Sequence, residues 1–267
     1  MGKKVLFINQ EIAPYVPNSE MSIFGADMPR HMQDAGFEIR TFMAAINERR
    51  GQLHEVIRLS GMNLIIDEMD HPLIIKVASI PQTRIQVYFI DNEDYFQKRL
   101  AMTKDELGND YPDNGERAIF FARGVLETVK KLRWAPDIIH CQGWMSSVIP
   151  FYVKTAYKDE PQFAKSKIVT SLFTEQPSDS LGKKFKQCLE FKSAELSKIE
   201  KYGDNFDFKE LGKLVIDYSD GIIQTSNNVN KELMQYAVDS KKEILMQPEN
   251  EADIQTRYTE FYNKIME

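Results

Sequence analysis

Cysteine and metal-binding motifs are scarce in this 267-residue chain. The two cysteines, Cys141 and Cys188, lie far apart and neither belongs to a CxxC pair, so neither a disulfide framework nor a zinc site is signalled. We expect two buried or half-buried thiols. The four histidines lie in unrelated contexts, and the GxSxG, HExxH and Walker motifs are absent. The sequence therefore predicts no metal site and no bound cofactor.

An excess of basic residues and a long hydrophobic run are also missing. The chain has 34 Lys and Arg residues against 40 Asp and Glu residues, a formal charge of −6, which argues against nucleic-acid or anionic-membrane partners. After Lys3 and Lys4, about five apolar residues precede Asn9 and Gln10, too few for a signal sequence or a membrane span. We therefore expect a cytoplasmic protein that binds neither nucleic acid nor membrane.

What the chain does contain is a repeated alternation of strand and helix patterns, with 42% hydrophobic residues to fill a core. Amphipathic helices are predicted at 116–133, 208–218 and 227–237, the last with Asn227 and Asn228 as its N-cap region. Strands are predicted by apolar, β-branched runs at 5–9, 38–43, 73–79, 85–91, 137–141, 167–173 and 221–226.

This order of elements predicts an α/β fold: one Rossmann-like domain over residues 1–267, with a mainly parallel sheet and helices on both faces. Residues 57–91 hold successive strands without a helix, which indicates an inserted β-excursion. Residues 156–166 and 176–206 are polar, and we expect surface loops or loosely docked helices there. The tail, 249–267, is predicted to be a helix packed back on the domain by Tyr258, Phe261, Tyr262 and Ile265.

The turn after the first predicted strand is short of glycine. Many nucleotide-using α/β proteins have glycines here, because the backbone must approach a phosphate closely at a helix N-terminus. This chain has Pro17-Asn18-Ser19-Glu20. Proline removes a backbone donor, and Glu20 adds negative charge. We interpret the stretch as a capped turn, with Asn18 or Ser19 as N-cap and Glu20 favouring the helix dipole.

Six stretches, taken in order, resemble the N-terminal half of bacterial glycogen and starch synthases. These are KKVLFINQEIAPYVPNSEMSIFGADMPRHM, EIRTFMAAINERRGQLHEVIRLSG, VYFIDNEDYF, DNGERAIFFARGVLE, APDIIHCQGWMSSVIPFYVKT and LVIDYSDGIIQTSNNVNKEL. The resemblance implies half of a GT-B glycosyltransferase fold. It also implies a family that extends α-1,4-glucan with glucose from ADP-glucose or UDP-glucose. A second Rossmann-like domain, which holds most of the nucleotide sugar in the family, is expected to be absent from this chain.

The resemblance also indicates which donor-side residues are lost. The family's phosphate-contacting lysine falls on Pro17, and its Gly-Gly pair falls on Ser19 and Glu20. Within HCQGWM, Gln142, Gly143 and Met145 replace His, Asp and His of the family. A further family histidine falls on Leu172 or Phe173. These losses predict a degenerate phosphate turn and a chain that does not bind the sugar nucleotide.

Other family positions persist, and they imply candidate acceptor-cleft residues: Glu11, Asp113, Asn114, Arg117, His140 and Trp144. Structural alternatives stay open for most of them. Asp113 serves equally well as an N-cap, with Glu116 completing a capping box and Arg117 exposed on the helix. His140 is alternatively a hydrogen-bonded core histidine. Trp144 stacks on a sugar ring or caps the core.

Two functional hypotheses follow. The first is a glycogen/starch synthase-like protein of α-glucan metabolism without autonomous glucosyltransferase activity, which binds α-glucan or a companion protein as a regulatory module. The second is an active glucosyltransferase whose second domain comes from another chain or from a homodimer partner. Both predict an apolar face where the family's second domain packs, and hence a homo-oligomer or a hetero-complex.

Overall fold

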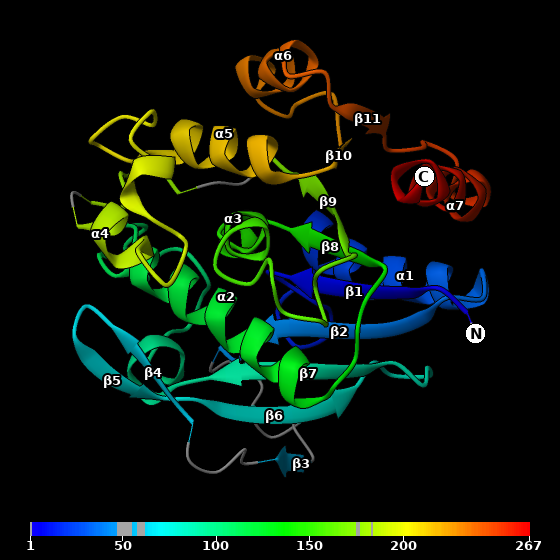
Figure 1. The fold of residues 1–267 in the computed structure, drawn as a ribbon. Coiled ribbons are helices and arrows are strands. Elements are labelled where there is room, and N and C mark those ends of the chain that lie inside the picture. Colours follow the sequence, from blue (N-terminus) through cyan, green and yellow to red (C-terminus); the bar gives the residue numbers. More distant parts are fainter. Residues whose placement is uncertain (1, 47–54, 58–61, 175–176, 183) are drawn as a thin grey trace.

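The structure is a computed structural model that describes residues 2–46, 55–57, 62–174, 177–182 and 184–267; the side chains of 55–57 are outside that description. Within these ranges one nine-stranded sheet has the order β11-β10-β9-β8-β1-β2-β7-β6-β3 (Figure 1). Its strands are β1 (Lys4–Asn9), β2 (Glu38–Ala44), β3 (Glu55–Ile57), β6 (Ile74–Ser79), β7 (Gln86–Asp91), β8 (Ile138–Gln142), β9 (Lys167–Leu172), β10 (Gly221–Gln224) and β11 (Glu243–Met246).

Pairing in this sheet is parallel from β11 through to β7 and antiparallel only at β7-β6 and β6-β3. A separate antiparallel hairpin, β4 (Asn63–Ile66) and β5 (Met69–Pro72), belongs to the same excursion. The chain passes from β1 to β2 on one side and later returns through β8 on the other. The strand order therefore reverses between β1 and β8, where open α/β sheets form their binding crevice.

Helices cover both faces of the sheet (Figure 1). The helices of the described ranges, with short 3-10 and π-helices marked η, are α1 (Glu20–Asp34), η2 (Glu93–Gln97), α2 (Asn114–Lys131), η3 (Trp144–Ser146), α3 (Ile149–Lys154), α4 (Phe185–Leu189), η4 (Leu196–Lys198), α5 (Phe208–Tyr218), α6 (Lys231–Asp239) and α7 (Glu251–Met266). Helices α1 and α7 lie against one face, and α2 and α3 against the other.

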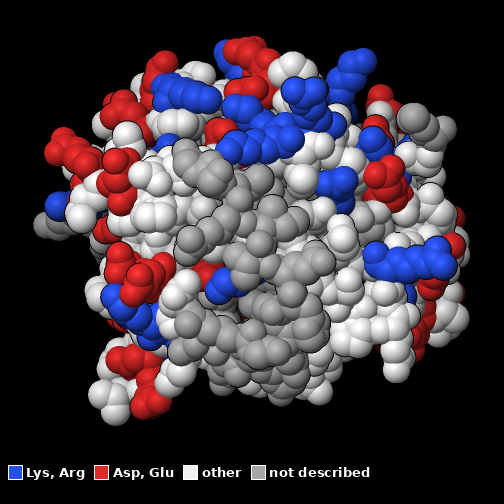
Figure 2. Space-filling view, turned by 90° about the horizontal axis from the view of Figure 1, so that it is seen from below, with Lys and Arg blue, Asp and Glu red and all other residues white. Residues whose placement is uncertain are grey.

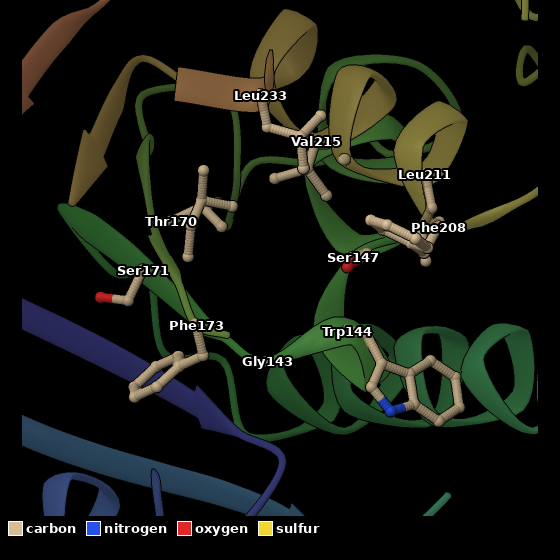
Figure 3. Close-up of a pocket in the computed structure, with 12 residues that line it drawn as sticks. Gly143, Trp144, Ser147, Thr170, Ser171, Phe173, Phe208, Leu211, Val215 and Leu233 are labelled. Carbon is tan, nitrogen blue, oxygen red and sulfur yellow. The ribbon is translucent and has the colours of Figure 1, made fainter. Parts of the chain in front are cut away.

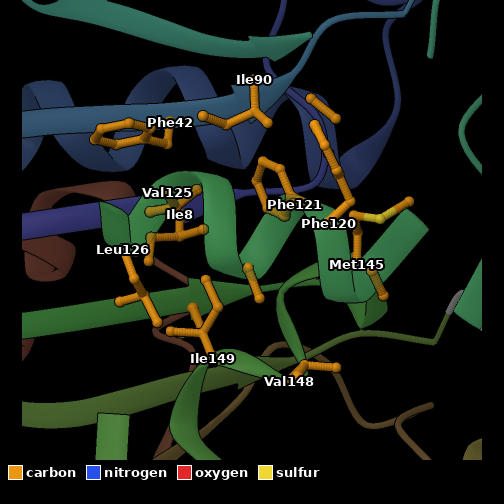
Figure 4. Close-up of a cluster of buried hydrophobic side chains, with 14 of the residues drawn as sticks. Ile8, Phe42, Ile90, Phe120, Phe121, Val125, Leu126, Met145, Val148 and Ile149 are labelled. Atoms are coloured by element: carbon orange, nitrogen blue, oxygen red, sulfur yellow. The ribbon is translucent and has the colours of Figure 1, made fainter. Parts of the chain in front are cut away.

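The two faces are supplied by alternate residues of β1, as strand geometry requires. Leu6 and Ile8 pack with α2 and α3 in a cluster that includes Phe121 and Ile149 (Figure 4). Val5 and Phe7 point to the opposite face and pack with α1 and α7. All of these strand side chains are buried, so β1 is the central strand of a sheet covered on both sides.

The predicted fold class is confirmed: a mainly parallel α/β sheet with helices on both faces and a β-excursion. The tail prediction is also confirmed, since α7 buries Tyr258, Phe261, Tyr262 and Ile265. Cys141 and Cys188 are buried free thiols. That residues 1–267 form one domain stays a prediction. Within the described ranges, no helix is both long and apolar enough to cross a membrane.

Two local predictions were wrong. Helix α6 begins at Lys231, and its N-cap is Asn230, whose side chain accepts from the Glu232 and Leu233 amides, so Asn227 and Asn228 precede the cap. Both segments predicted to be surface loops or loosely docked helices, 156–166 and 176–206, contribute to the core. Tyr157 and Phe163 of the first segment are buried, and so are Phe185, Leu189, Tyr202 and Phe206 of the second, in the cluster around α2. Residues 58–61, 175–176 and 183 of the predicted segments lie outside the described residues.

Candidate functional site

The candidate site lies at the carboxyl ends of β1 and β8, where the reversal of strand order in an open α/β sheet places the binding crevice. Gln10 and Glu11 follow β1 there, and Gly143 and Trp144 follow β8. The N-terminus of α1 opens on the same edge, as does the N-terminus of α2. The fold thus brings the sequence-predicted turn, Pro17–Glu20, to the crevice together with the predicted residues that follow β1 and β8.

The N-terminus of α1 is closed by its own side chains. Ser19 is the N-cap: its Oγ accepts from the Ser22 amide at 2.9 Å, and the Ser19 amide donates to Ser22 Oγ at 2.8 Å, a complete capping box. Ser19 Oγ in turn donates to Glu11 Oε2 at 2.6 Å. Two of the backbone donors that a phosphate would need are therefore occupied, and a carboxylate lies beside them.

Buried amide side chains form the floor of the crevice. Gln10 accepts from the Met145 amide through Oε1 at 3.2 Å, and Gln142 donates to the Met21 carbonyl at 2.7 Å. Gln10 Nε2 and Gln142 Oε1 are buried without a partner in the described structure. Such atoms in a polar site are suited to an ordered water.

Gly143 sets the shape of this floor. Its φ of +79° and ψ of 166° fall in a region that essentially only glycine adopts. A Cβ at this position would lie 2.6 Å from Gln10 Oε1. The aspartate that the family resemblance places here would therefore require a different backbone and a displaced Gln10.

His140 is a core residue. It is fully buried in β8, with Nδ1 hydrogen-bonded to Tyr262 Oη at 2.5 Å and Nε2 to Ser171 Oγ at 2.7 Å. Burial lowers its pKa to about 3, because the imidazolium form would lose its hydration. The imidazole is neutral at neutral pH and both of its nitrogens are occupied, so the hydrogen-bonded core interpretation is the one the geometry supports.

Trp144 is also built into the core. Its exposed fraction is 4%, and Nε1 donates to Thr103 Oγ1 at 2.8 Å. The ring lines a pocket of about 30 Å³ between η3, β9, α5 and α6, which Phe208, Leu211 and Val215 also line (Figure 3). This volume holds one or two water molecules and is too small for a sugar ring.

At the start of α2 the predicted capping box does not form. Asp113 occupies the N-cap position without a capping hydrogen bond, and its carboxylate pairs with Arg99 at 2.6 Å. Glu116 instead accepts from Tyr95 Oη at 3.0 Å. Asp113 therefore stands at the N-cap position, as the structural alternative proposed, but the capping box that belonged to it was wrong, because both carboxylates are held by other partners.

Arg117 was predicted to be exposed under the same alternative, and this too was wrong, because the residue is fully buried. Its guanidinium donates to the Tyr95 carbonyl at 2.8 Å, the Met102 carbonyl at 2.7 Å and Asn114 Oδ1 at 2.7 Å. Burial lowers its pKa to about 10, so it is charged at neutral pH. Arg117 thus organises the loop between β7 and α2.

An open pocket lies beside these buried groups. A pocket of about 150 Å³ at the N-terminus of α2 is lined by Tyr111, Asn114, Asp179 and Ser180. Asp179 and Ser180 did not stand out in the sequence, since they belong to a polar segment without a periodic pattern. A role for Glu11, Asp113 and Asn114 in binding an acceptor stays a prediction. No group of three potential metal ligands occurs among the described residues.

Comparison with known proteins places this geometry in a family. Residues 4–247 match the family model described as starch synthase catalytic domain. The chain belongs to this starch synthase family. It is similar to a glycogen synthase of Chlorobium luteolum, 41% identical over 63% of this chain and 35% of that protein. A glycogen synthase of Chlorobaculum parvum is 33% identical over 86% of this chain and 47% of that protein.

Solved structures show the same fold at low sequence identity. The catalytic domain of starch synthase IV from Arabidopsis thaliana, bound to ADP and acarbose, superposes with a TM-score of 0.73 at 16% identity, over 92% of this chain and 51% of that one. A sucrose-phosphate synthase from Thermosynechococcus elongatus gives 0.51 at 11% identity, over 99% of this chain. The chain spans about a third to a half of the length of the glycogen synthases cited.

Proposed function

We propose that this chain is a starch synthase family protein of α-glucan metabolism that binds glucan but does not transfer glucose from a sugar nucleotide on its own. The observation that carries the proposal is the contact between Glu11 and Ser19 at the N-terminus of α1. It sits where the resemblance places the diphosphate of the donor.

A diphosphate at a helix N-terminus requires free backbone N–H groups and a positive charge to stabilise the leaving group. In this chain the Ser19 and Ser22 amides are used in the capping box. Pro17 has no N–H, and Glu11 and Glu20 contribute negative charge. Each of these features disfavours the binding of a phosphate group, so together they weaken it further.

Gly143 supports the same conclusion independently. The resemblance puts an active-centre aspartate at this position, yet the glycine-only backbone and the contact with Gln10 leave no room for it. Loss of one charged or polar group at such a centre commonly lowers the rate by about 10² or more. Loss on both sides of the crevice is consistent with a protein without turnover.

Glucan binding is supported by the pocket at the N-terminus of α2. The Asp179 carboxylate, the Ser180 hydroxyl and the Tyr111 ring line it, and these groups suit sugar hydroxyls and the apolar face of a pyranose. The Asn114 amide also lines the pocket but is held by Thr103 and Arg117. Its opening lies next to Asp113 and Asn114, two of the predicted acceptor residues.

Calorimetric titration of the full chain with ADP-glucose and with maltoheptaose tests the proposal. We expect heat from maltoheptaose alone, and reduced affinity in Asp179→Asn. The triple variant P17K/S19G/E20G should gain affinity for ADP if the closed turn is the cause of the loss. Binding of ADP-glucose to the unaltered chain tighter than about millimolar, or transfer of glucose to a glucan primer, would overturn the proposal.

A companion chain that completes the crevice is the second candidate, with ADP-glucose as donor. It is favoured by Ile23 in the first turns of α1, which is 46% exposed, and by the groove of about 260 Å³ that it forms with Phe24 and Ile254. Light scattering on the purified chain tests the homo-oligomeric form. A strictly monomeric protein, together with transfer activity that no added chain restores, would remove this candidate.

A further inference from the structure

A pocket of about 570 Å³ lies on the outer side of α2, away from the crevice. Its walls are the β4-β5 hairpin, α2 and the segment that runs from α4 to Phe191, which lie together at the left of Figure 1. None of the residues that line it belongs to the starch synthase crevice described above. Its volume is within the range of pockets that hold small molecules.

Arg123 of α2 forms the floor of this pocket. Its exposed fraction is 8%, Nη1 donates to the Ile65 carbonyl, and the guanidinium lies 3.9 Å from the centroid of the Phe191 ring. Nε is buried and has no hydrogen-bond partner in the described structure. Among the described residues, no carboxylate lies within ion-pair distance of this arginine.

A buried cation without a counter-charge is unfavourable, so an anionic hydrogen-bond acceptor would stabilise the Arg123 guanidinium. Because the Ile65 carbonyl occupies Nη1 and Nε is buried, a carboxylate that uses the opposite edge of the guanidinium, Nε and Nη2, must displace the side chains that cover Nε. That edge has the geometry that binds a carboxylate through two parallel hydrogen bonds.

The rim of the pocket has the opposite charge. Asp67, Glu68 and Glu190 line the pocket and are exposed, and Lys184 Nζ lies 3.6 Å from Asp67 Oδ2. Acidic side chains, with some basic ones among them, lie along the left edge of the view from below (Figure 2). Asp67 and Glu68 form the hairpin turn with φ of 48° and 64°, a left-handed conformation that is unfavourable for residues other than glycine. A simple anion would be repelled by this rim, and a simple cation would leave Arg123 unpaired.

We propose that this pocket binds a zwitterion of the amino-acid type, such as an α-amino acid, an ω-amino acid or a short peptide. The carboxylate pairs with Arg123, and the ammonium group lies among Asp67, Glu68 and Glu190. An uncharged polyol supplies donors to the rim but no counter-charge to the buried guanidinium, and is therefore disfavoured. This inference is independent of glucan binding and of sugar transfer.

The test is a calorimetric titration of the full chain with ω-amino acids of increasing length: glycine, 4-aminobutanoate and 6-aminohexanoate. Butanoate and butylamine are the single-charge controls, and maltotriose is the polyol control. We expect at least one amino acid to bind about tenfold more tightly than either single-charge control. Glu68→Gln and Glu190→Gln should each weaken that binding severalfold. Asp70→Asn, on the same hairpin but outside the lining, should not change it.

Arg123→Lys keeps the charge and removes the side-on pair of donors, so binding should fall about tenfold if the variant melts like the parent chain. If it does not fold, the two rim variants carry the test. Equal binding of butanoate and aminobutanoate, binding of maltotriose in preference to all amino acids, or no binding of any amino acid would overturn the proposal.

Discussion

Glu11 and Ser19 join the end of β1 to the start of α1 through a hydrogen bond of 2.6 Å from Ser19 Oγ to Glu11 Oε2. Ser19 also holds both halves of the capping box. Ser19→Ala should therefore lower the free energy of unfolding by about 1 kcal/mol, measured by urea denaturation. Asn18 is exposed and does not cap the helix, so Asn18→Ala should change stability by less than about 0.5 kcal/mol. Equal losses in the two variants would contradict the assigned N-cap.

Alanine substitutions at Gly143 and Gly36 distinguish the cost of backbone strain from the cost of a steric clash. Both have positive φ, +79° and +92°, but only Gly143 has a neighbour that a Cβ would strike, Gln10 at 2.6 Å. Gly36→Ala should cost about 1 to 2 kcal/mol from the left-handed conformation. Gly143→Ala should cost about 1 to 3 kcal/mol more, because Gln10 must move. Thermal melts of the two variants measure the difference, and a Gly36 variant at least as unstable as the Gly143 variant would contradict it.

Burial of His140 should make the stability of the folded chain sensitive to acid. Its pKa falls from 6.5 in the unfolded chain to about 3 in the folded one, because burial disfavours the imidazolium. The unfolded state then binds more protons between these pH values, so this residue's contribution is complete above about pH 6.5 and declines as the pH falls toward 3. We expect the stability of the parent chain relative to His140→Gln to decline over that window. A difference independent of pH between 7 and 4 would contradict a buried neutral histidine.

Replacement of Arg117 is expected to be costly, because its guanidinium is fully buried and holds three acceptors. Arg117→Met leaves the Tyr95 and Met102 carbonyls and Asn114 Oδ1 without their donor. Each loss of a buried partner costs about 1 to 3 kcal/mol, so the variant should be destabilised by several kcal/mol. Arg30, whose side chain is 49% exposed in a surface ion pair with Asp27, is the matched control. Arg30→Gln should stay within about 0.5 kcal/mol in the same denaturant titration.

The fold followed from patterns that are local in sequence. Runs such as VLFIN and DIIHC are mostly apolar because both faces of their strands are covered, and the apolar stripe of α2 reflects its packing against the sheet. β11 was missed because Glu243 and Met246, its terminal residues, are exposed at the sheet edge, so the run is too short and too polar to stand out.

The site was less accessible to sequence reasoning, since its contacts join segments that are distant along the chain. Ser19 as N-cap follows from spacing, but its bond to Glu11 depends on how two loops fold together. A buried arginine such as Arg117 looks like a surface residue in a helix, because its partners come from the preceding loop. The same holds for Arg123, whose contacts are Ile65 and Phe191.

Helix α7 has a consequence for how the domain is made in the cell. The side chains of Val5 and Phe7 share their cluster with Tyr258 and Tyr262, more than 250 residues later in the chain. During synthesis from the N-terminus, this face of the central strand is incompletely covered until α7 leaves the ribosome. Exposed apolar surface of this kind favours aggregation, so truncation before Tyr258 should yield a chain that aggregates rather than a smaller folded domain.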